Sequence, residues 1–232
     1  MPSILPRYAA ILVLPFLAAC AAAPRLSDVP PEYQAVDDGG YHIEAVDPRY
    51  LTELNRRAEV NYNGPDAPGT IVIDTFSRRL YHVQEGGRAT RYAIAVGRQG
   101  LAMRGRSRVG RKEHWPSWTP TQNMIRTQPE TYAQYAGGLP GGLDNPLGSR
   151  ALYLYRGNRD SYFRIHGTID NASIGRATSA GCIRLFNQDA MHLFDRVPLN
   201  TPVKVRTRDE SLRLEGLYED DEYGRITPAI QS

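Results

Sequence analysis

Short apolar runs, each about the length of a β-strand, follow one another from residue 69 to residue 207 of this 232-residue chain. Turn-forming residues separate the runs, which cover residues 70–74, 79–83, 91–96, 151–155, 162–166 and 202–206. Runs of this length between breakers are typical of strands, and the first two predict a hairpin. The best helical pattern is confined to 187–195, where Asn187 is a candidate cap. The sequence therefore predicts one mainly β domain over 69–207 with few short helices.

A long segment rich in Gly, Pro and Trp separates the third run from the fourth, between Gly97 and Arg150. Connections of this length without their own secondary structure are uncommon in compact domains, and they are usually functional. We therefore expect this segment to build a binding surface.

The segment before the domain carries breakers rather than a core pattern. Residues 20–46 are rich in Ala, Pro, Asp and Gly, which predicts a flexible tether. Asp47 and Pro48 supply a cap and a first-turn proline, so we expect residues 47–68 to form a short helix to about Asn61, followed by a linker.

Charge and metal-ligand patterns exclude several classes of function. The 28 basic and 25 acidic residues give a formal charge of +3, which is too balanced to indicate a nucleic-acid partner. The densest acidic run, 219–222, lies within residues 208–232, which predicts a solvated C-terminal tail. No HExxH, HxxxH or CxxC spacing and no glycine-rich phosphate loop occurs, so we expect neither a metal nor a cofactor.

The N-terminal segment has the layout of a secretory signal peptide. A single arginine precedes an uncharged apolar stretch over residues 8–19, which is too short to span a bilayer. The sequence Leu-Ala-Ala-Cys at 17–20 resembles a bacterial lipoprotein cleavage site, so residues 1–19 would be removed and Cys20 would carry lipid. An ordinary signal peptide cut shortly afterwards is the alternative. The lipoprotein interpretation predicts a periplasmic protein anchored to a membrane, and Ala21 favours the outer membrane.

Cys182 and His166 are the strongest candidates for chemistry. If lipid occupies Cys20, Cys182 would be a thiol in an oxidising compartment, where an idle thiol is a liability. His166 lies sixteen positions upstream at the end of a predicted strand, and a neighbouring imidazole can ionise a thiol near neutral pH. Spacing alone does not exclude a buried structural cysteine.

The residues around this pair resemble the signature of the YkuD-type L,D-transpeptidase catalytic domain, in particular the ErfK, YbiS, YcfS and YnhG group. The matching strings are Ile165-His166-Gly167-Thr168 and Ser179-Ala180-Gly181-Cys182-Ile183-Arg184-Leu185, with weaker matches at 68–74, 115–120 and 145–148. The resemblance covers about 69–207 and implies a fold of β-sandwich or barrel-like type. Many members carry a histidine where this chain has Ala180, so a supporting role for that second imidazole is absent here.

The resemblance implies that the protein joins or edits peptidoglycan stem peptides. The Cys182 thiolate would attack the carbonyl that links the third stem residue to D-Ala in a tetrapeptide donor, and D-Ala would leave as a thioester forms. His166 would take the thiol proton and return it to the departing amine, while the carbonyl of Gly167 orients the other ring nitrogen. Donor and acceptor stem peptides are the expected partners, together with an outer-membrane protein or lipoprotein as an acceptor.

Five further residues are candidates for supporting roles. Backbone N–H groups around Gly181 would hold the oxyanion, and Ser179 would support the same loop. Arg184 could bind a substrate carboxylate or brace the cysteine loop through an internal ion pair. Trp115 and Trp118 could line the donor cleft or belong to the core.

The sequence leaves the acceptor and the activity itself open. Water as the acceptor would make the protein an L,D-carboxypeptidase or a cross-link hydrolase, and a protein amine would make it a ligase of proteins to the cell wall. A non-catalytic wall-binding lipoprotein with a decayed site is an alternative of another class, which the change at Ala180 would fit. A papain-like protease is disfavoured because its cysteine precedes its histidine.

Overall fold

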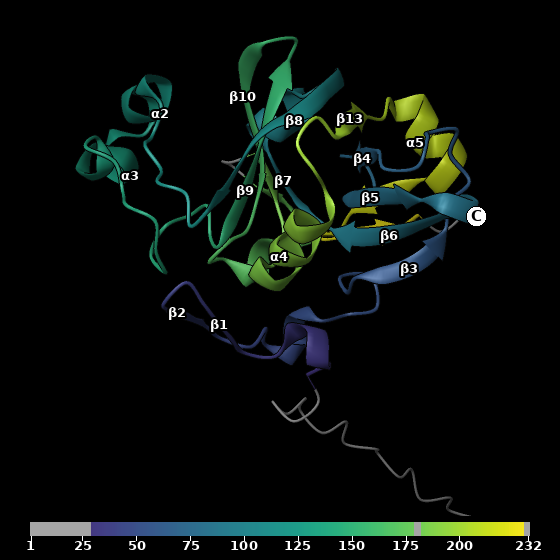
Figure 1. The fold of residues 1–232 in the computed structure, drawn as a ribbon, viewed down its shortest axis with the longest axis horizontal. Helices are drawn as coiled ribbons and strands as arrows, with labels where there is room; N and C mark the ends of the chain where they lie inside the picture. The colour runs from purple at the N-terminus through teal and green to yellow at the C-terminus, as the bar shows by residue number, and fades with distance from the viewer. Residues whose placement is uncertain (1–28, 179–181, 230–232) are drawn as a thin grey trace, which may run out of the picture.

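One large mixed sheet dominates the computed structural model, which describes residues 29–178 and 182–229 (Figure 1). Its described strands run in the order β11-β7-β12-β10-β9-β8-β13-β4-β5-β6-β3. They are β3 (Ala58–Asn61), β4 (Ile71–Asp74), β5 (Arg79–Gln84), β6 (Arg88–Ala93), β7 (Ala95–Gly97), β8 (Gly105–His114), β9 (Arg150–Arg156), β10 (Arg159–His166), β11 (Ala177–Thr178), β12 (Ile183–Arg184) and β13 (Pro202–Val205). Two small antiparallel pairs are β1 (Val36–Asp38) with β2 (Tyr41–Ile43), and β14 (Tyr218–Asp220) with β15 (Ile226–Pro228).

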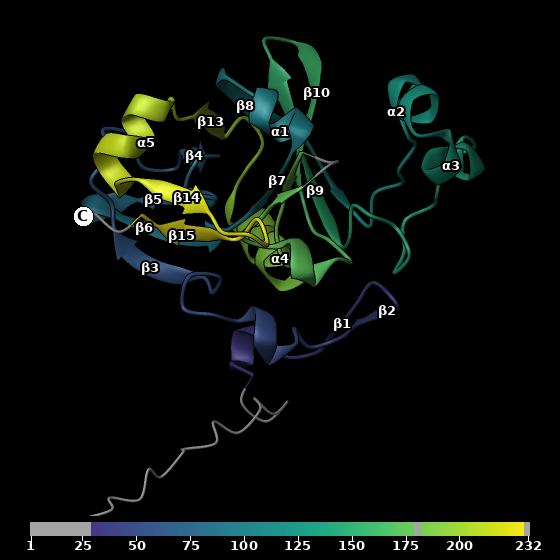
Figure 2. The ribbon, with the colours of Figure 1, turned by 180° about the vertical axis from the view of Figure 1, so that it is seen from behind.

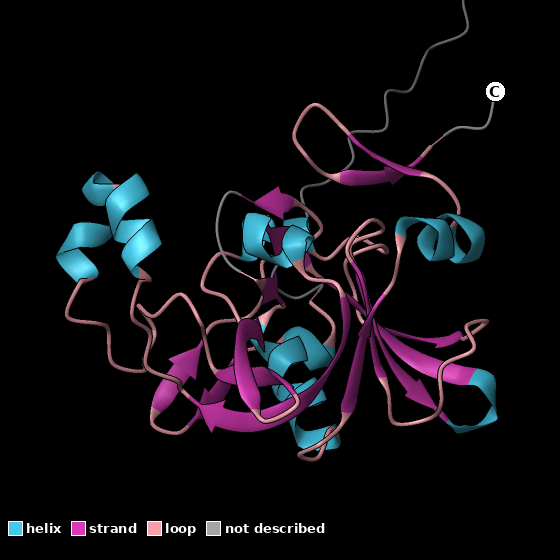
Figure 3. Cartoon of the chain, turned by 90° about the horizontal axis from the view of Figure 1, so that it is seen from above, coloured by secondary structure: helices cyan, strands magenta, loops and turns pink. Residues whose placement is uncertain are grey.

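Helices are short and lie around the sheet (Figures 2 and 3). The α-helices are α1 (Arg98–Ala102), α2 (Gln122–Thr127), α3 (Pro129–Tyr132), α4 (Asn187–Arg196) and α5 (Arg208–Glu215). Single 3₁₀ turns cover Pro31–Tyr33, Pro48–Tyr50, Glu85–Gly87, Ala133–Tyr135 and Asn171–Ser173. Helix α4 packs against β9 and β10, whereas α2 and α3 stand out from the body of the sheet (Figure 1). Within the described ranges, no helix is long and apolar enough to cross a membrane.

The core forms where apolar side chains of the central strands meet α4. Ile73, Leu154, Ile165 and Leu193 are each at most 1% exposed and belong to one cluster. Burial of this kind contributes about 25 cal/mol per Å² of apolar surface and is the main force that holds the sheet to the helix. The prediction of a mainly β fold with few short helices is confirmed, and five expected strand runs coincide with β4, β5, β9, β10 and β13.

The predicted binding segment between Gly97 and Arg150 contains the longest described strand, β8, which the sequence pattern did not reveal. Half of its residues are charged, and Val109 is its one fully buried apolar side chain. On its outer face, the guanidinium of Arg111 lies 3.6 Å from the ring centre of Tyr153 on β9. Such cation–π stacking lets a polar sequence form a central strand, because Arg108 and Arg111 each cover a tyrosine ring of β9.

The prediction of a flexible tether is wrong for residues 29–46. Tyr33 and Val46 are fully buried and pack with Phe186. The Tyr33 hydroxyl donates a hydrogen bond to Asp189 of α4 at 3.2 Å, and Arg57 forms an ion pair with the same carboxylate at 2.7 Å. The buried Tyr33, through its ring and its hydrogen bond to Asp189, and the buried Val46 therefore fasten this segment to the domain, while residues 20–28 lie outside the described part.

The helix expected from Asp47 to about Asn61 is also wrong beyond its first turn. Asp47 does cap a helical turn, since its side chain accepts from the backbone N–H of Arg49 at 2.9 Å, but the 3₁₀ turn ends at Tyr50. Residues Ala58–Asn61 instead form β3, which pairs with β6. The edge of β6 offers this segment a ladder of backbone hydrogen bonds, whereas a short isolated helix is only marginally stable in water.

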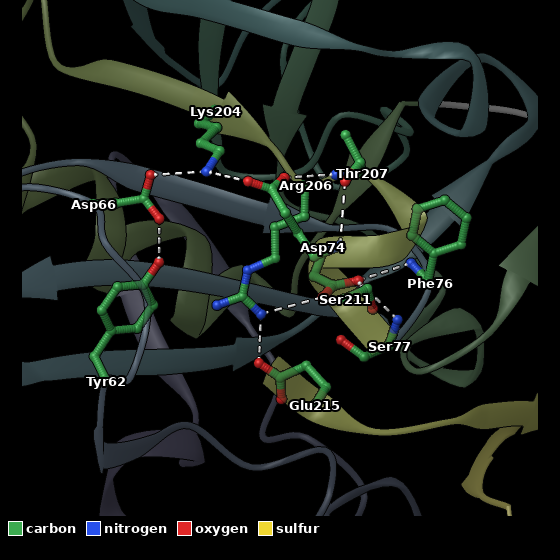
Figure 4. Close-up of polar contacts among 11 residues, drawn as sticks. Tyr62, Asp66, Asp74, Phe76, Ser77, Lys204, Arg206, Thr207, Ser211 and Glu215 are labelled. Atoms are coloured by element: carbon green, nitrogen blue, oxygen red, sulfur yellow. Dashed lines mark hydrogen bonds and ion pairs between the residues drawn. The ribbon is translucent and has the colours of Figure 1, made fainter. Parts of the chain in front are cut away.

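The prediction of a solvated tail from residue 208 is wrong for the described part, which ends at 229. Thr207 and Glu210 form a capping box that starts α5, and the β14–β15 hairpin follows. Ser211 of α5 donates to the buried Asp74 at 2.8 Å, and Asp74 pairs with Arg206 at 3.2 Å (Figure 4). This buried network fastens the C-terminal segment to β4.

Candidate active site

Strand pairing, continued one residue before β12 by the hydrogen bond from Gly97 N–H to the Cys182 carbonyl, indicates that His166 and Cys182 share one face of the sheet. Strands β10 and β12 are parallel, with Ile165 opposite Ile183 and His166 opposite Arg184. Both isoleucines are buried in the core, so residues one position away point to the opposite face. Cys182 lies two residues before Arg184, which sets its Cα diagonal to that of His166 at about 8 Å, from the usual strand spacing and rise. An imidazole and a thiol can meet across that diagonal.

The His166 ring is held in one tautomer by its neighbour. Its Nδ1 lies 2.6 Å from the carbonyl oxygen of Gly167, which can only accept, so Nδ1 carries the proton and Nε2 keeps its lone pair. The ring is 4% exposed. Burial, with the positive charges of Arg184 and Arg164, lowers the pKa of His166 to about 4, against the hydrogen bond to Gly167. The imidazole is therefore neutral at neutral pH.

The Cys182 thiol is protonated in the resting site. Its Sγ donates to the backbone carbonyl of Tyr162 at 3.7 Å, and the residue is 6% exposed. Burial raises the pKa of the Cys182 thiol, although the backbone N–H of Arg164 and the charges of Arg164 and Arg184 lower it. Burial therefore favours the neutral forms of both Cys182 and His166 in the resting site.

Asn187 shapes the turn that carries Gly167, and sequence reasoning missed this role. Its Oδ1 accepts from the backbone N–H of Ser149 at 2.9 Å, and a Cβ on Gly167 would lie only 2.2 Å from that oxygen. The same clash would meet a side chain on Gly148, whose φ is +63°. Asn187 was expected to cap α4, but Phe186 occupies the cap position and the amide of Asn187 faces this turn instead.

A cavity of about 230 Å³ opens beside His166, and one of its walls comes from α2, α3 and the turn that follows. Trp118, which precedes α2, also lines the cavity, with its ring centre 6.2 Å from that of Tyr132. The lining also includes Tyr135, Leu147, Ile169 and Arg184. A larger cavity of about 570 Å³ lies between residues 49–55, 172–176 and the β14–β15 hairpin, and neither His166 nor Cys182 lines it. Proximity to His166, rather than size, identifies the smaller cavity as the candidate site.

The remaining candidate residues divide between the cavity and other parts of the chain. Arg184 lines the cavity and also lies 3.8 Å from Asp170 in an ion pair, so both roles expected for it are compatible with its position. Trp115 lies instead against the N-terminal hairpin, where its indole N–H donates to Asp38 at 2.7 Å and its ring stacks on Tyr41. Ser179, Ala180, Gly181 and Cys20 lie outside the described residues.

In the described ranges, no group of three or more His, Cys, Asp or Glu side chains could hold a metal ion. What the site does offer is a neutral base and a thiol on one face, with two arginines near both. Such an arrangement suits nucleophilic acyl transfer, in which the base accepts the thiol proton during attack. Two cations also suit a substrate that carries carboxylates.

Comparisons with known proteins agree with this chemistry. A family model described as the YkuD L,D-transpeptidase catalytic domain matches residues 68–205. The Escherichia coli K12 protein described as probable L,D-transpeptidase ErfK/SrfK is 36% identical over 138 residues, which are 58% of this chain and 43% of that protein. Probable L,D-transpeptidase YcfS of the same strain is 34% identical over 169 residues, 67% of this chain and 52% of that protein. The chain spans about half the length of these curated relatives.

Among solved structures, a Brucella melitensis protein described as a probable carnitine operon oxidoreductase is 47% identical to this chain. The match covers 65% of this chain and 94% of that protein, with a TM-score of 0.48. The oxidoreductase description concerns that protein alone.

Proposed function

The chain belongs to the YkuD family of L,D-transpeptidase catalytic domains, and on that premise we propose that it is a peptidoglycan L,D-transpeptidase with Cys182 as nucleophile and His166 as base. The feature that supports the proposal is the register of β10 with β12, from which we infer a shared sheet face for the two side chains, together with the hydrogen bond between Nδ1 of His166 and the carbonyl of Gly167. That hydrogen bond leaves Nε2 as the nitrogen that can take a proton.

The proton moves during attack rather than before it. As Sγ of Cys182 bonds to the carbonyl carbon of the third stem residue, its proton passes to Nε2 of His166, and the carbonyl oxygen becomes an oxyanion. The backbone N–H groups of Gly181 and Cys182 hold that oxyanion, each worth about 3 kcal/mol in comparable hydrolases. The C–N bond to D-Ala then breaks, His166 returns the proton to the leaving amine, and a thioester remains.

The second half of the reaction uses the same base. His166 takes a proton from the amine of an acceptor stem peptide, or of a protein, as that nitrogen attacks the thioester. The thiol regains its proton when the C–S bond breaks. Arg184 and Trp118 line the cavity beside His166, and we assign them to the carboxylates and the apolar parts of the donor.

A product assay tests this function. The purified protein is incubated with a disaccharide tetrapeptide, and the products are identified by mass spectrometry. Release of D-Ala together with cross-linked dimers supports the transpeptidase. D-Ala release without dimers would replace it with a carboxypeptidase, and an unchanged substrate would favour the non-catalytic wall-binding protein.

The pH dependence of kcat/KM should reflect the lowered pKa of His166. Because burial lowers the pKa of His166 to about 4, the base is active above that pH and lost below it. The acidic limb of kcat/KM for D-Ala release should therefore fall near pH 4, well below the 6.5 of an ordinary histidine. Circular dichroism at each pH serves as the control for unfolding. An acidic limb at pH 6.5 or higher would contradict a buried neutral base.

We also propose that residues 1–19 are a signal peptide and that lipid on Cys20 anchors the protein to a membrane facing the periplasm, the outer membrane being favoured. The apolar segment and its cleavage sequence support this location, where peptidoglycan is accessible. Incorporation of a fatty-acyl label tests it. The label should disappear in Cys20→Ser, and equal labelling of both proteins would contradict the anchor.

A further inference from the structure

A large bulge interrupts β10 directly beside the nucleophile. Asp160 pairs with Tyr155 and Arg164 with Tyr153, so three residues of β10, 161–163, face the single intervening residue of β9. At the middle of the bulge, Tyr162 has φ +62° and its side chain is 77% exposed. A bulky aromatic residue rarely adopts this left-handed conformation, and such strain persists only where surrounding contacts impose it.

The contacts that impose it start from Asp160. Its Oδ1 accepts from the backbone N–H of Tyr162 at 2.8 Å, and its two oxygens bind both terminal nitrogens of Arg164 at 2.7 and 2.8 Å. The Ser161 hydroxyl donates to the carbonyl of Leu154, the β9 residue opposite the bulge, at 2.5 Å. The bulge is therefore closed at both ends by side-chain hydrogen bonds.

The backbone groups displaced by the bulge face the sulfur of Cys182. The carbonyl of Tyr162 accepts from Sγ at 3.7 Å, and the backbone N–H of Arg164 donates to Sγ. Residues in a bulge are left out of the regular ladder, so their N–H and C=O groups are available to other partners. The Tyr162 carbonyl can thus accept a hydrogen bond from the Cys182 thiol, and the Arg164 N–H can donate one to the thiolate.

We propose that Tyr162 is a positioning residue, whose left-handed backbone aims the Tyr162 carbonyl and the Arg164 N–H at the Cys182 sulfur. The inference rests on the proposed function, because positioning the sulfur matters only if Cys182 is the nucleophile. Its test measures the reactivity of the thiol and does not require transpeptidation. The carbonyl holds the thiol proton in the resting state, and the N–H stabilises the negative sulfur as the proton leaves. The backbone conformation of Tyr162, rather than its aromatic ring, carries this positioning role.

The charged groups around the Cys182 sulfur stay the same when Tyr162 is replaced, so the hydrogen bonds to the sulfur determine the direction in which its pKa changes. The charged groups near it are Arg164 on β10 and Arg184 on β12. Their ion-pair partners are Asp160 on β10 and Asp170 in the loop after β10. His166 ends β10, and Glu113 and Arg111 on β8 lie next to Tyr153. None of these is altered by a substitution at Tyr162. A straightened bulge removes both the Arg164 N–H and the Tyr162 carbonyl from the sulfur. A hydrogen bond to a charged sulfur is stronger than the long bond from a neutral thiol, so the loss of the donor decides and the pKa of the Cys182 thiol should rise.

Two substitutions at Tyr162 separate backbone from ring. Valine resists the left-handed region because it is β-branched, whereas asparagine adopts it readily, and both remove the ring. Iodoacetamide reacts with the thiolate, so the alkylation of Cys182 in the full-length protein is followed against pH by mass spectrometry of the peptide 177–184. Tyr162→Val should slow alkylation at pH 7 about tenfold and raise its pH midpoint by about one unit, and Tyr162→Asn should restore the rate to within about twofold of wild type.

The control is Asn200→Val, which forces valine into another left-handed position, φ +69°, away from the site. It should lower thermal stability without changing the alkylation midpoint. If Tyr162→Val does not fold, Tyr162→Ala takes its place and should show a smaller shift in the same direction.

Three outcomes would overturn the proposal: wild-type alkylation in both Tyr162 variants, equally slow alkylation in both, or a matching shift in Asn200→Val. Alkylation does not require transpeptidation. A protein that lacks D-Ala release but shows the expected alkylation series would therefore refute the proposed function and leave the positioning role standing.

Discussion

Replacing Cys182 with alanine is expected to lower the rate of D-Ala release from a disaccharide tetrapeptide by at least about a thousandfold, because the covalent route loses the atom that attacks. The thermal midpoint should change little. The thiol is buried, and alanine leaves behind only the volume of one sulfur atom. Mass spectrometry of the intact protein should also show that a carbapenem adds to the wild-type protein and not to Cys182→Ala.

The companion control is His166→Gln, which keeps a polar side chain beside Gly167 but removes the base. It should retain Cys182 and yet fail to release D-Ala near neutral pH, since a buried thiol with a raised pKa is not ionised there on its own. Retention of more than a tenth of wild-type activity in Cys182→Ala would refute the nucleophile. Loss of activity accompanied by a large fall in thermal midpoint would point to folding instead.

Patterns of burial explain which parts of the fold were predictable from sequence. Strands such as Ile71–Asp74 and Arg150–Arg156 are buried along almost their whole length, and their runs of apolar residues predicted them. Strand β8 has polar residues on a face that stacks cations on tyrosines, and its pattern resembled a loop. The segments before residue 47 and after residue 208 carry isolated anchors such as Tyr33 and Ser211, whose value depends on partners more than a hundred residues away in the sequence.

The candidate site divides in the same way. Local strings singled out His166 and Cys182, because the chemistry needs those residue types in that order. The protonation states could not be predicted, since they depend on how completely the fold removes water from both groups. Asn187 and Tyr162 were missed for a related reason. Asn187 acts through an amide directed at a distant turn, and Tyr162 through its backbone angle. The residue type alone indicates neither role.

Asp74 is expected to be the costliest buried polar residue to lose. Its Oδ1 accepts from the backbone N–H groups of Phe76 and Ser77 and from the hydroxyl of Ser211, and its Oδ2 pairs with Arg206 (Figure 4). Both charged side chains are at most 2% exposed. Removing one partner of a buried ion pair typically costs about 3–5 kcal/mol, because the other charge stays buried with less compensation.

Asp74→Ala should therefore lower the free energy of unfolding by about 3 kcal/mol and the thermal midpoint by about 10 °C. The cost should lie at the lower end of the range for buried ion pairs because Glu215 still pairs with Arg206. Ser211→Ala removes a single neutral donor and should cost about 1 kcal/mol. Asp37→Ala, whose carboxylate is 85% exposed beside His42, should leave the urea midpoint unchanged. Equal urea midpoints for Asp74→Ala and Ser211→Ala would show that Arg206 is neutralised by Glu215 alone. Helix α5 would then be held by its capping box and apolar contacts. Asp74 would stabilise only the turn after β4, through the backbone N–H groups of Phe76 and Ser77.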